Sequence, residues 1–262
     1  MLSLCIGIVA GVVAGFGAYR LRWLSLSGSV FAGILAAVLI ICGGVEWIVP
    51  MIAFFIPSSM LSVIFERKKA SVTLAFEKGS RRDALQVLVN GGVGGVLVFI
   101  WFVTRQDELF LMYLGGLTAV AADTWATESG ILWGRSPVRL VSFERVEPGT
   151  SGAVSAVGTL GGLAGAICIS LSGLAWIPNP KMIAVLAAVL AGMTGCMIDS
   201  VLGAVVQRRY RCMKCGRLIE RPVHCDANAE WIGGLRWFNN DLVNLACYLG
   251  GMISVLGWYR VI

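Results

Sequence analysis

Residues 182–206 read MIAVLAAVLAGMTGCMIDSVLGAVV, an apolar run that contains one charged residue, Asp199. A helix needs about 20 such residues to cross the hydrocarbon core of a bilayer. Gly192 and Gly195 lie inside the run, where small side chains let neighbouring membrane helices pack closely. This stretch therefore predicts a transmembrane helix with an acid toward its C-terminal end.

Similar apolar runs recur along the whole chain. Of its 262 residues, 57% are hydrophobic and 14% are charged, whereas about 25% of the residues of a soluble domain are charged. We therefore expect an all-α polytopic transmembrane helix bundle that forms a single integral membrane domain over residues 1–262. The eight predicted spans lie near residues 2–19, 27–45, 47–65, 84–104, 110–133, 152–177, 182–206 and 241–259. No basic region precedes the first span, so it is expected to be retained rather than cleaved as a signal peptide.

The distribution of basic residues predicts the orientation. All but three of the 21 lysines and arginines lie in the loops after the first, third, fifth and seventh spans, and the exceptions are Arg105, Lys181 and Arg260. These four loops are therefore expected to be cytoplasmic, with both termini outside and the plasma membrane as the location in a prokaryote. Topology and anionic headgroups account for the net charge of +6, so no nucleic acid partner is expected.

Polar side chains interrupt four of the spans. An ionisable group inside a bilayer is costly unless it is paired or hydrated, so each one is a candidate functional residue. The predicted topology brings all of them toward the cytoplasmic ends of their helices, where one cleft can collect them. They are Asp83, Gln86 and Asn90 in the fourth span, Asp123, Thr124, Thr127 and Glu128 in the fifth, Asp199 and Gln207 in the seventh, and Asn240, Asp241 and Asn244 in the eighth.

Carboxylates with nearby amides and basic residues suit Mg²⁺ and a phosphate ligand. Asp123, Asp199 and Asp241 are the predicted Mg²⁺ ligands. Glu128 lies about 140° around the helix from Asp123, and we expect it to hold a second metal or to orient the acceptor. The alternative is that the acids only form interhelical hydrogen bonds or cap helices, which applies most to Asp83 and Asp241.

Two loops are candidate phosphate-binding segments. Residues 77–83, EKGSRRD, place Lys78, Arg81 and Arg82 before a helix start, where free N–H groups favour anions. Residues 147–152, EPGTSG, offer two hydroxyls and two glycines that permit close backbone approach. The same patterns are typical of a positive-inside anchor and of an ordinary helix start, and these interpretations stay open.

The predicted cytoplasmic loop 207–240 contains Cys212, Cys215, His224 and Cys225. A C-x₂-C pair followed by His and Cys has the ligand types and spacing of a small structural Zn²⁺ site. A cytoplasmic position disfavours a disulfide. Because the His and the last Cys are adjacent, both reaching one ion is demanding, and free thiols are the alternative.

Five longer motifs occur in the order of one known family. They are GSRRDALQVLVNGG at 79–92, ADTWATE at 122–128, VEPGTSG at 146–152, IDSVLGA at 198–204 and NNDLVN at 239–244. The chain resembles the integral membrane family that includes transmembrane protein 19 and the plant and cyanobacterial phytyl-phosphate kinases, known as domain of unknown function 92. The resemblance covers most of the chain from about residue 75 onward.

The resemblance implies a Mg²⁺-dependent membrane kinase that converts a polyprenyl or phytyl monophosphate to the diphosphate with a nucleoside triphosphate. A more distant likeness to the CTP-using dolichol kinases and CDP-diacylglycerol synthases favours CTP. Phosphoryl transfer of this kind depends on positioning and charge neutralisation. The expected catalytic residues are Asp123, Glu128, Asp199 and Asp241. The expected substrate- and nucleotide-binding residues are Lys78, Arg81, Arg82, Asp83, Gln86, Asn90, Thr124, Glu147, Gly149, Thr150, Ser151, Ser200, Gln207, Asn240 and Asn244.

A secondary transporter or ion-coupled carrier is the alternative function, because it also places carboxylates within spans. Its site is expected near the midplane, often between internal repeats. The sequence has no convincing repeat, and its polar groups gather toward one face, which favours the kinase. A non-catalytic lipid-binding or assembly subunit is a third interpretation.

Overall fold

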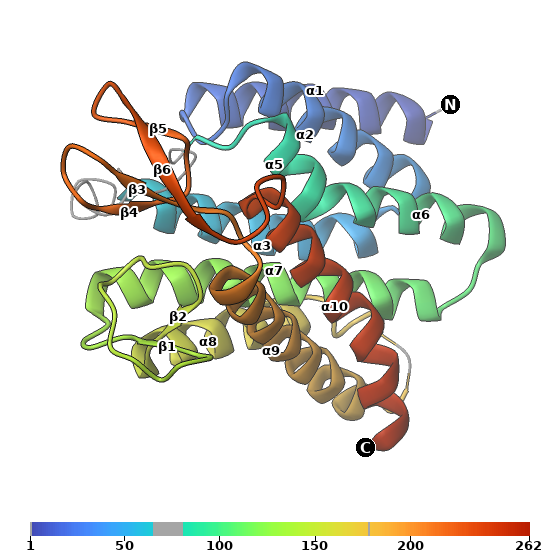
Figure 1. Ribbon diagram of the computed structural model, residues 1–262. Helices are drawn as coiled ribbons and strands as arrows, with labels where there is room; N and C mark the ends of the chain where they lie inside the picture. The colour runs from blue at the N-terminus through green and yellow to red at the C-terminus, as the bar shows by residue number, and fades with distance from the viewer. Residues whose placement is uncertain (1, 65–80, 178) are drawn as a thin grey trace.

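The computed structural model describes residues 2–64, 81–177 and 179–262. Most of these residues form long helices that run between two ends of the molecule (Figure 1). The first half of the chain forms α1 (Leu2–Arg20), α2 (Leu26–Val38), the π-helical turn η1 (Leu39–Gly43), α3 (Val45–Ile64), α5 (Ala84–Val87), the π-helical turn η2 (Leu88–Gly92) and α6 (Val93–Thr104). The second half forms α7 (Glu108–Trp133), α8 (Ala156–Ser172), α9 (Lys181–Val205) and α10 (Asn240–Val261).

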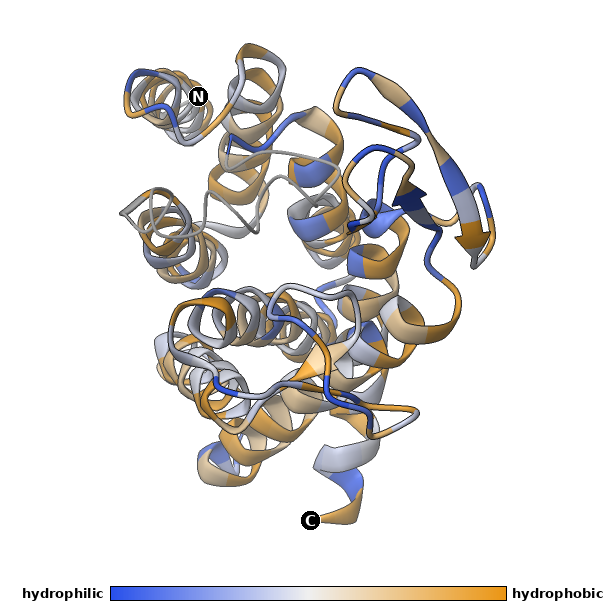
Figure 2. Ribbon diagram, turned by 60° about the vertical axis from the view of Figure 1, so that its left-hand side comes forward, coloured by the Kyte–Doolittle hydropathy of each residue, from blue (hydrophilic) through white to orange (hydrophobic). Residues whose placement is uncertain are grey.

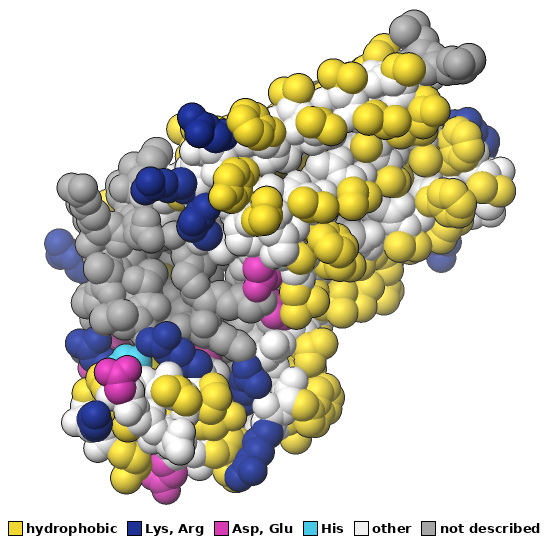
Figure 3. All heavy atoms as spheres, turned by 90° about the horizontal axis from the view of Figure 1, so that it is seen from above, with side chains coloured by type: hydrophobic (Ala, Val, Ile, Leu, Met, Phe, Trp, Pro, Cys, Tyr) yellow, Lys and Arg dark blue, Asp and Glu magenta, His cyan; other side chains and the backbone are white. Residues whose placement is uncertain are grey.

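Seven helical segments of the described chain are long and apolar enough to cross a membrane, and α8 is apolar but shorter at 17 residues. Two of the seven are composite, because α2 continues into η1, and α5 continues through η2 into α6. These eight segments match the eight predicted spans, which confirms the polytopic helical membrane protein. Their outer faces are apolar, as a lipid-facing surface requires, and on α1 both Val9 and Phe16 are more than 60% exposed (Figure 3).

The helices α1, α3, α7 and α9 all finish at one side of the molecule, here called the loop end (Figure 1). Arg20 ends α1 at the loop end, and Arg135 and Arg208 lie in connections there, whereas Arg105 follows α6 and Lys181 begins α9 at the opposite end. Both termini also lie away from the loop end. This is the distribution that the positive-inside rule predicts for a cytoplasmic loop end.

Two small antiparallel sheets at the loop end were not predicted from the sequence. In the first, β1 (Val138–Arg139) pairs with β2 (Ala153–Val154). The second has the strand order β4-β3-β6-β5 and lies between α9 and α10 in the chain. Its strands are β3 (Arg209–Cys212), β4 (Leu218–Ile219), β5 (Val223–His224) and β6 (Ala227–Gly233). Figure 2 shows that these strands and the connecting loops carry hydrophilic segments, while hydrophobic ones follow the helices.

The sixth predicted span begins later than expected. It was predicted from residue 152, whereas α8 begins at Ala156 because the residues before it form β2 and a cap. The Ser155 hydroxyl accepts a hydrogen bond of 3.1 Å from Gly158 N, which satisfies a free N–H at the helix start. The chain between α7 and α8 is consequently a longer loop than the sequence indicated.

The helix α7 is the centre of the bundle. In its most apolar stretch of 18 residues 72% of the residues are buried, against 22–50% in the corresponding stretches of the other long spans. It packs against α8, α9 and α10, and also against α3 and α6. Gly116 allows close approach of the Tyr248 ring, and the Tyr113 hydroxyl donates a 2.7 Å hydrogen bond to Trp47 O. The polar residues near the end of α7 are therefore held on a rigid support.

Candidate active site

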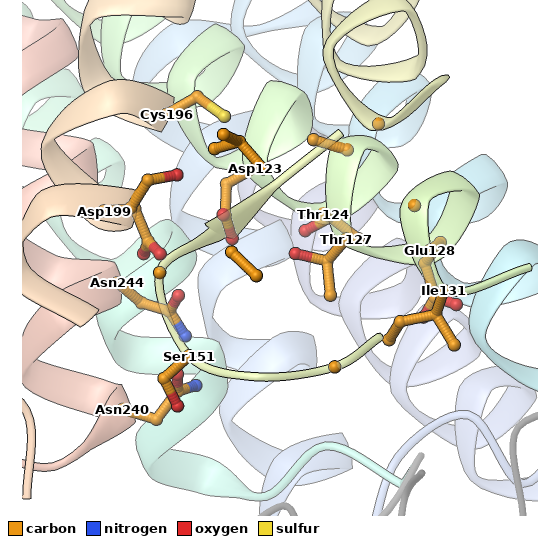
Figure 4. A pocket seen from close by; sticks show the side chains of 18 of the residues that line it. Asp123, Thr124, Thr127, Glu128, Ile131, Ser151, Cys196, Asp199, Asn240 and Asn244 are labelled. Carbon is orange, nitrogen blue, oxygen red and sulfur yellow. The ribbon is translucent and has the colours of Figure 1, made fainter. Parts of the chain in front are cut away.

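A cavity of about 290 Å³ lies at the loop end, between α7, α9, the first turns of α5 and α10, and the loop that precedes α8. Polar side chains from these separate elements line it together (Figure 4). The predicted site residues that line it are Arg82, Gln86, Asn90, Asp123, Thr124, Glu128, Gly149, Thr150, Ser151, Asp199, Ser200, Gln207, Asn240, Asp241 and Asn244. Ile131, Met193 and Met197 give the same cavity an apolar part.

Two carboxylates from different helices meet in this cavity. Asp123 of α7 and Asp199 of α9 point into the same space and contact each other (Figure 4). Asn244 of α10 points into this space as well. Asp241, in the first turn of α10, is 3% exposed and lines the cavity too. Three helices thus deliver acidic side chains to one enclosed volume.

One buried carboxylate oxygen in the cavity, on Asp199, has no hydrogen-bond partner among the described residues. Within the described parts of the chain, the buried Oδ2 of Asp199 makes no hydrogen bond, and neither does the buried Nε2 of Gln207. A buried polar atom without a partner is costly, so it calls for a ligand or ion. Asp123, Asp199 and the nearby amides have the hard oxygen atoms that Mg²⁺ prefers, and this ion usually takes one or two carboxylates from a protein, so the pair fits it. Asp241 lines the same cavity, but within the described chain it does not form a cluster of three ligand atoms with the pair.

Glu128 faces a different neighbour. Its Oε1 accepts a 2.7 Å hydrogen bond from Ser62 Oγ of α3, and its side chain is 8% exposed. In Figure 4 it lies on the far side of Thr124 and Thr127 from Asp199, as the angle around α7 predicts. Burial lowers the pKa of Arg82, and the negative charge of Glu128 opposes that change. Glu128 therefore stabilises a partly buried cation at one side of the cavity.

Arg82 is fixed by its backbone before α5 begins. Its N–H donates to Trp23 O at 3.2 Å and its carbonyl accepts from Ser25 N at 3.0 Å, which ties it to the α1–α2 connection. Its guanidinium carbon lies 5.8 Å from the centre of the Phe54 ring. This partly buried cation is thus positioned beside the cavity by the α1–α2 connection and by α3.

Four predicted substrate-binding residues do not belong to the described cavity. Asp83 forms a capping box with Gln86, with hydrogen bonds of 2.9 and 3.1 Å. It therefore caps the start of α5, which is the alternative role considered for it in the sequence analysis. Arg81 is exposed and lies against Leu24 O and the Tyr19 ring. Glu147 is exposed, and its carbonyl accepts hydrogen bonds from Thr150 N and Oγ1. Lys78 lies outside the described residues.

The loop EPGTSG forms a tight turn over the end of α9. Gly149 and Gly152 have φ values of +84° and +72°, in the left-handed region that favours glycine. A side chain at Gly152 would meet the backbone at Ser200 and Ala204, so the loop lies directly on α9. The Thr150 hydroxyl is used within the turn, which leaves backbone groups and Ser151 to face the cavity.

Glu220 is a cavity residue that the sequence analysis missed. It follows β4, is 7% exposed, and its Oε1 accepts a 2.6 Å hydrogen bond from Ser151 Oγ. No motif singles it out, because it lies in an arginine-rich loop and pairs with a residue that is distant in the chain.

The four predicted zinc ligands also come together, at the turns of the larger sheet. One ligand atom from each of Cys212, Cys215, His224 and Cys225 lies within 4.8 Å of the others. This cluster is separate from the cavity, because none of its residues lines it.

The fold and cavity define a class of protein: a polytopic helical membrane protein with a polar, carboxylate-rich site at one end of its helices. Residues 9–252 match the family described as integral membrane protein DUF92, and the chain belongs to this family. The prediction from the five motifs is thereby confirmed at the level of the family. No solved structure matches the chain.

Relatives occur in plants, archaea and cyanobacteria. Protein PGR of Arabidopsis thaliana is 29% identical, over 92% of this chain and 91% of that protein. An uncharacterized membrane protein of Methanocaldococcus jannaschii is 28% identical over 98% and 94% of the two chains. Protein VTE6, chloroplastic, of Arabidopsis thaliana is 24% identical over 78% of this chain and 56% of that protein.

Proposed function

We propose that this protein is a membrane-embedded kinase that transfers a phosphoryl group from a nucleoside triphosphate, CTP, to a polyprenyl or phytyl monophosphate. The observation that carries the proposal is the meeting of Asp123 and Asp199 from two helices, with an unpartnered buried oxygen on Asp199. The family resemblance supplies the acceptor class, and the more distant likeness to CTP-using dolichol kinases and CDP-diacylglycerol synthases favours CTP as the nucleotide.

The site suits a reaction that needs positioning rather than a general base. A phosphate monoester acceptor is already an anion near neutral pH, so its oxygen can attack without losing a proton to the protein. An oxygen lone pair of the acceptor forms the new bond to the γ-phosphorus, and the bond from that phosphorus to the bridging oxygen breaks. The bonding pair leaves with the nucleoside diphosphate.

Each group of cavity residues has a part in this proposal. Asp123 and Asp199, with Asp241 in the same cavity, would hold Mg²⁺, which when bound neutralises charge on the transferring phosphates. Arg82 supplies a fixed positive charge to a phosphate on the other side of the cavity. The backbone N–H groups of Gly149 and Ser151 would provide further donors for phosphate oxygens, whereas the Thr150 N–H is used within the turn.

The apolar part of the cavity suits the start of a prenyl chain. Ile131, Met193 and Met197 lie beside the polar residues, and methionine adapts its shape to flexible apolar ligands. We propose that the acceptor phosphate lies near the acids while the chain continues toward the membrane interior.

The test is an assay of purified protein in detergent with Mg²⁺ and phytyl or geranylgeranyl phosphate. CTP, ATP, GTP and UTP are supplied separately, and the lipid products are separated by mass spectrometry. We expect the prenyl diphosphate with CTP as the preferred donor. Absence of a diphosphate product with every donor and with both acceptors would overturn the kinase proposal.

A further inference from the structure

We infer that the sheet β4-β3-β6-β5 holds one structural Zn²⁺ ion through Cys212, Cys215, His224 and Cys225, and that this ion keeps Glu220 against the cavity loop. The inference does not depend on the proposed kinase activity. It rests on the arrangement of two turns, on the small core of the sheet and on one contact to the cavity.

The four ligand atoms already lie close to the spacing of a tetrahedral site. A Zn–S bond of about 2.3 Å puts the ligand atoms of a tetrahedron about 3.8 Å apart. Here the His224 Nδ1 is 3.2 Å from Cys225 Sγ and 3.5 Å from Cys215 Sγ. All four ligand atoms are within 4.8 Å of one another, so a contraction of less than about 1 Å completes the site.

The turn between β5 and β6 explains how adjacent residues share one ion. His224 pairs with Ala227, so the hairpin loop consists of Cys225 and Asp226, and both have φ of +53°. Two successive positive φ values define the type I′ turn, which usually contains Asn and Gly. A cysteine in this strained position brings its thiol back beside the preceding histidine, which a simple hairpin does not require.

The turn between β3 and β4 presents the other two ligands. Gly216 N donates to Cys212 O at 2.9 Å, and Cys212 N donates to Arg217 O at the same distance. Gly216 has φ of +72°, so the chain reverses directly after Cys215. Each of the two turns thus contributes a pair of ligands, and the two pairs come together at Cys215 and His224.

The sheet has little else to hold it together. Among the described residues its core cluster consists of Tyr210, Cys212 and Ile219, with Ala229 packed against them. A core of this size cannot offset the loss of chain entropy by itself, and small domains of this kind depend on a metal or disulfides. The three cysteines are free thiols, so a metal is the remaining cross-link.

The sheet is connected to the cavity at Glu220. This residue directly follows β4, two residues after the strand begins at Leu218, and it accepts the hydrogen bond from Ser151 Oγ. Leu235 N also donates to Val206 O at 2.9 Å, which joins the sheet to the end of α9. Loss of the ion would therefore loosen β4, release Glu220 and free the loop at Ser151.

The test is the zinc content of protein purified in detergent and dialysed against a weak chelator, measured by plasma mass spectrometry. We expect about one zinc per chain in the wild type and in Cys5→Ser, whose cysteine is exposed on α1. Cys215→Ser, which removes an exposed ligand, should lose most of the bound zinc. His224→Cys should retain it, because four thiolates also bind Zn²⁺ tetrahedrally.

Cobalt gives a second readout that does not depend on the metal present during expression. Co²⁺ added to chelator-stripped wild type should give thiolate charge-transfer and tetrahedral d–d absorption, and Cys215→Ser should not. Less than about 0.1 equivalent of zinc together with no such absorption would overturn the inference. Equal zinc in the wild type and in Cys215→Ser would overturn it as well.

Discussion

Ser151 Oγ donates a 2.6 Å hydrogen bond to Glu220 Oε1, and this bond joins the loop before α8 to the sheet between α9 and α10. Both residues line the cavity. A sheet at the loop end, in a segment that the sequence analysis predicted only as a loop, is thereby part of the wall of the candidate active site.

The Ser151–Glu220 bond should be measurable as coupling between two substitutions. Ser151→Ala removes the donor and Glu220→Ala removes the acceptor, so each should lower the apparent Tm in detergent, and the double variant should lose less than the sum of the two effects. A hydrogen bond to a buried carboxylate suggests a coupling energy of about 1–3 kcal/mol. Strict additivity of the two effects would show that the residues do not interact in solution.

Ser62→Ala should destabilise the protein. The Ser62 hydroxyl donates to the buried Glu128, so its removal withdraws a hydrogen bond from a charge and should cost about 1–3 kcal/mol. Ser59→Ala is the matched control on α3, because Ser59 Oγ is buried without a partner in the described chain and its loss should cost little. Thermal unfolding of the two variants gives the comparison, and equal effects would refute this role of Ser62.

Gly152→Ala should distort the loop over α9. The position has φ of +72°, and a Cβ there would meet the backbone of α9, so we expect a loss of about 2 kcal/mol or more. Gly17→Ala is the control, because a Cβ at Gly17 meets nothing and alanine favours the helix by up to about 1 kcal/mol. The apparent Tm values of the two variants are compared with that of the wild type. An unchanged Tm for Gly152→Ala would contradict the described loop.

Zinc removal should expose the arginine-rich strands to protease. With the ion bound, β3 and β4 pair through Tyr210 with Ile219 and Arg211 with Leu218, which restrains the chain around Arg217. Chelation should speed tryptic cleavage there by about tenfold or more, because local opening then needs less free energy. The peptides are identified by mass spectrometry. Cys5→Ser, which keeps all four zinc ligands, is the control and should be cleaved like the wild type with and without chelator. Cleavage at the same rate with and without chelator would argue against a structural ion.

The spans were predictable because the length and apolarity of a membrane helix are local properties of the sequence. The shared location of Asp123, Asp199 and Asp241 was predictable from the basic residues of the loops. These residues predict which helix ends lie on the same side of the membrane, and the three acids lie toward those ends. Asp83 carries the right chemistry, but its side chain caps the start of α5. The Glu147 side chain is exposed, and the backbone carbonyl of this residue accepts the hydrogen bonds of the turn.

The contacts that could not be predicted are those between distant segments. Ser62 with Glu128 and Ser151 with Glu220 depend on which helix or strand packs beside which, and no local pattern encodes that. The strands β4 and β5 have two residues each, too short for a visible alternation of polar and apolar positions. The joint approach of His224 and Cys225 depends on a turn with left-handed residues that are not glycine.

The most direct test of the account is the rate of prenyl diphosphate formation by Asp199→Asn. Asn keeps the shape of the side chain and removes the charge that Mg²⁺ needs, so kcat/KM should fall by about 100-fold or more, while the apparent Tm is maintained. Asp107→Asn, at an exposed acid at the opposite end of α7, should be as active as the wild type. Full activity of Asp199→Asn would contradict the claim that acids from separate helices share one ion in the cavity.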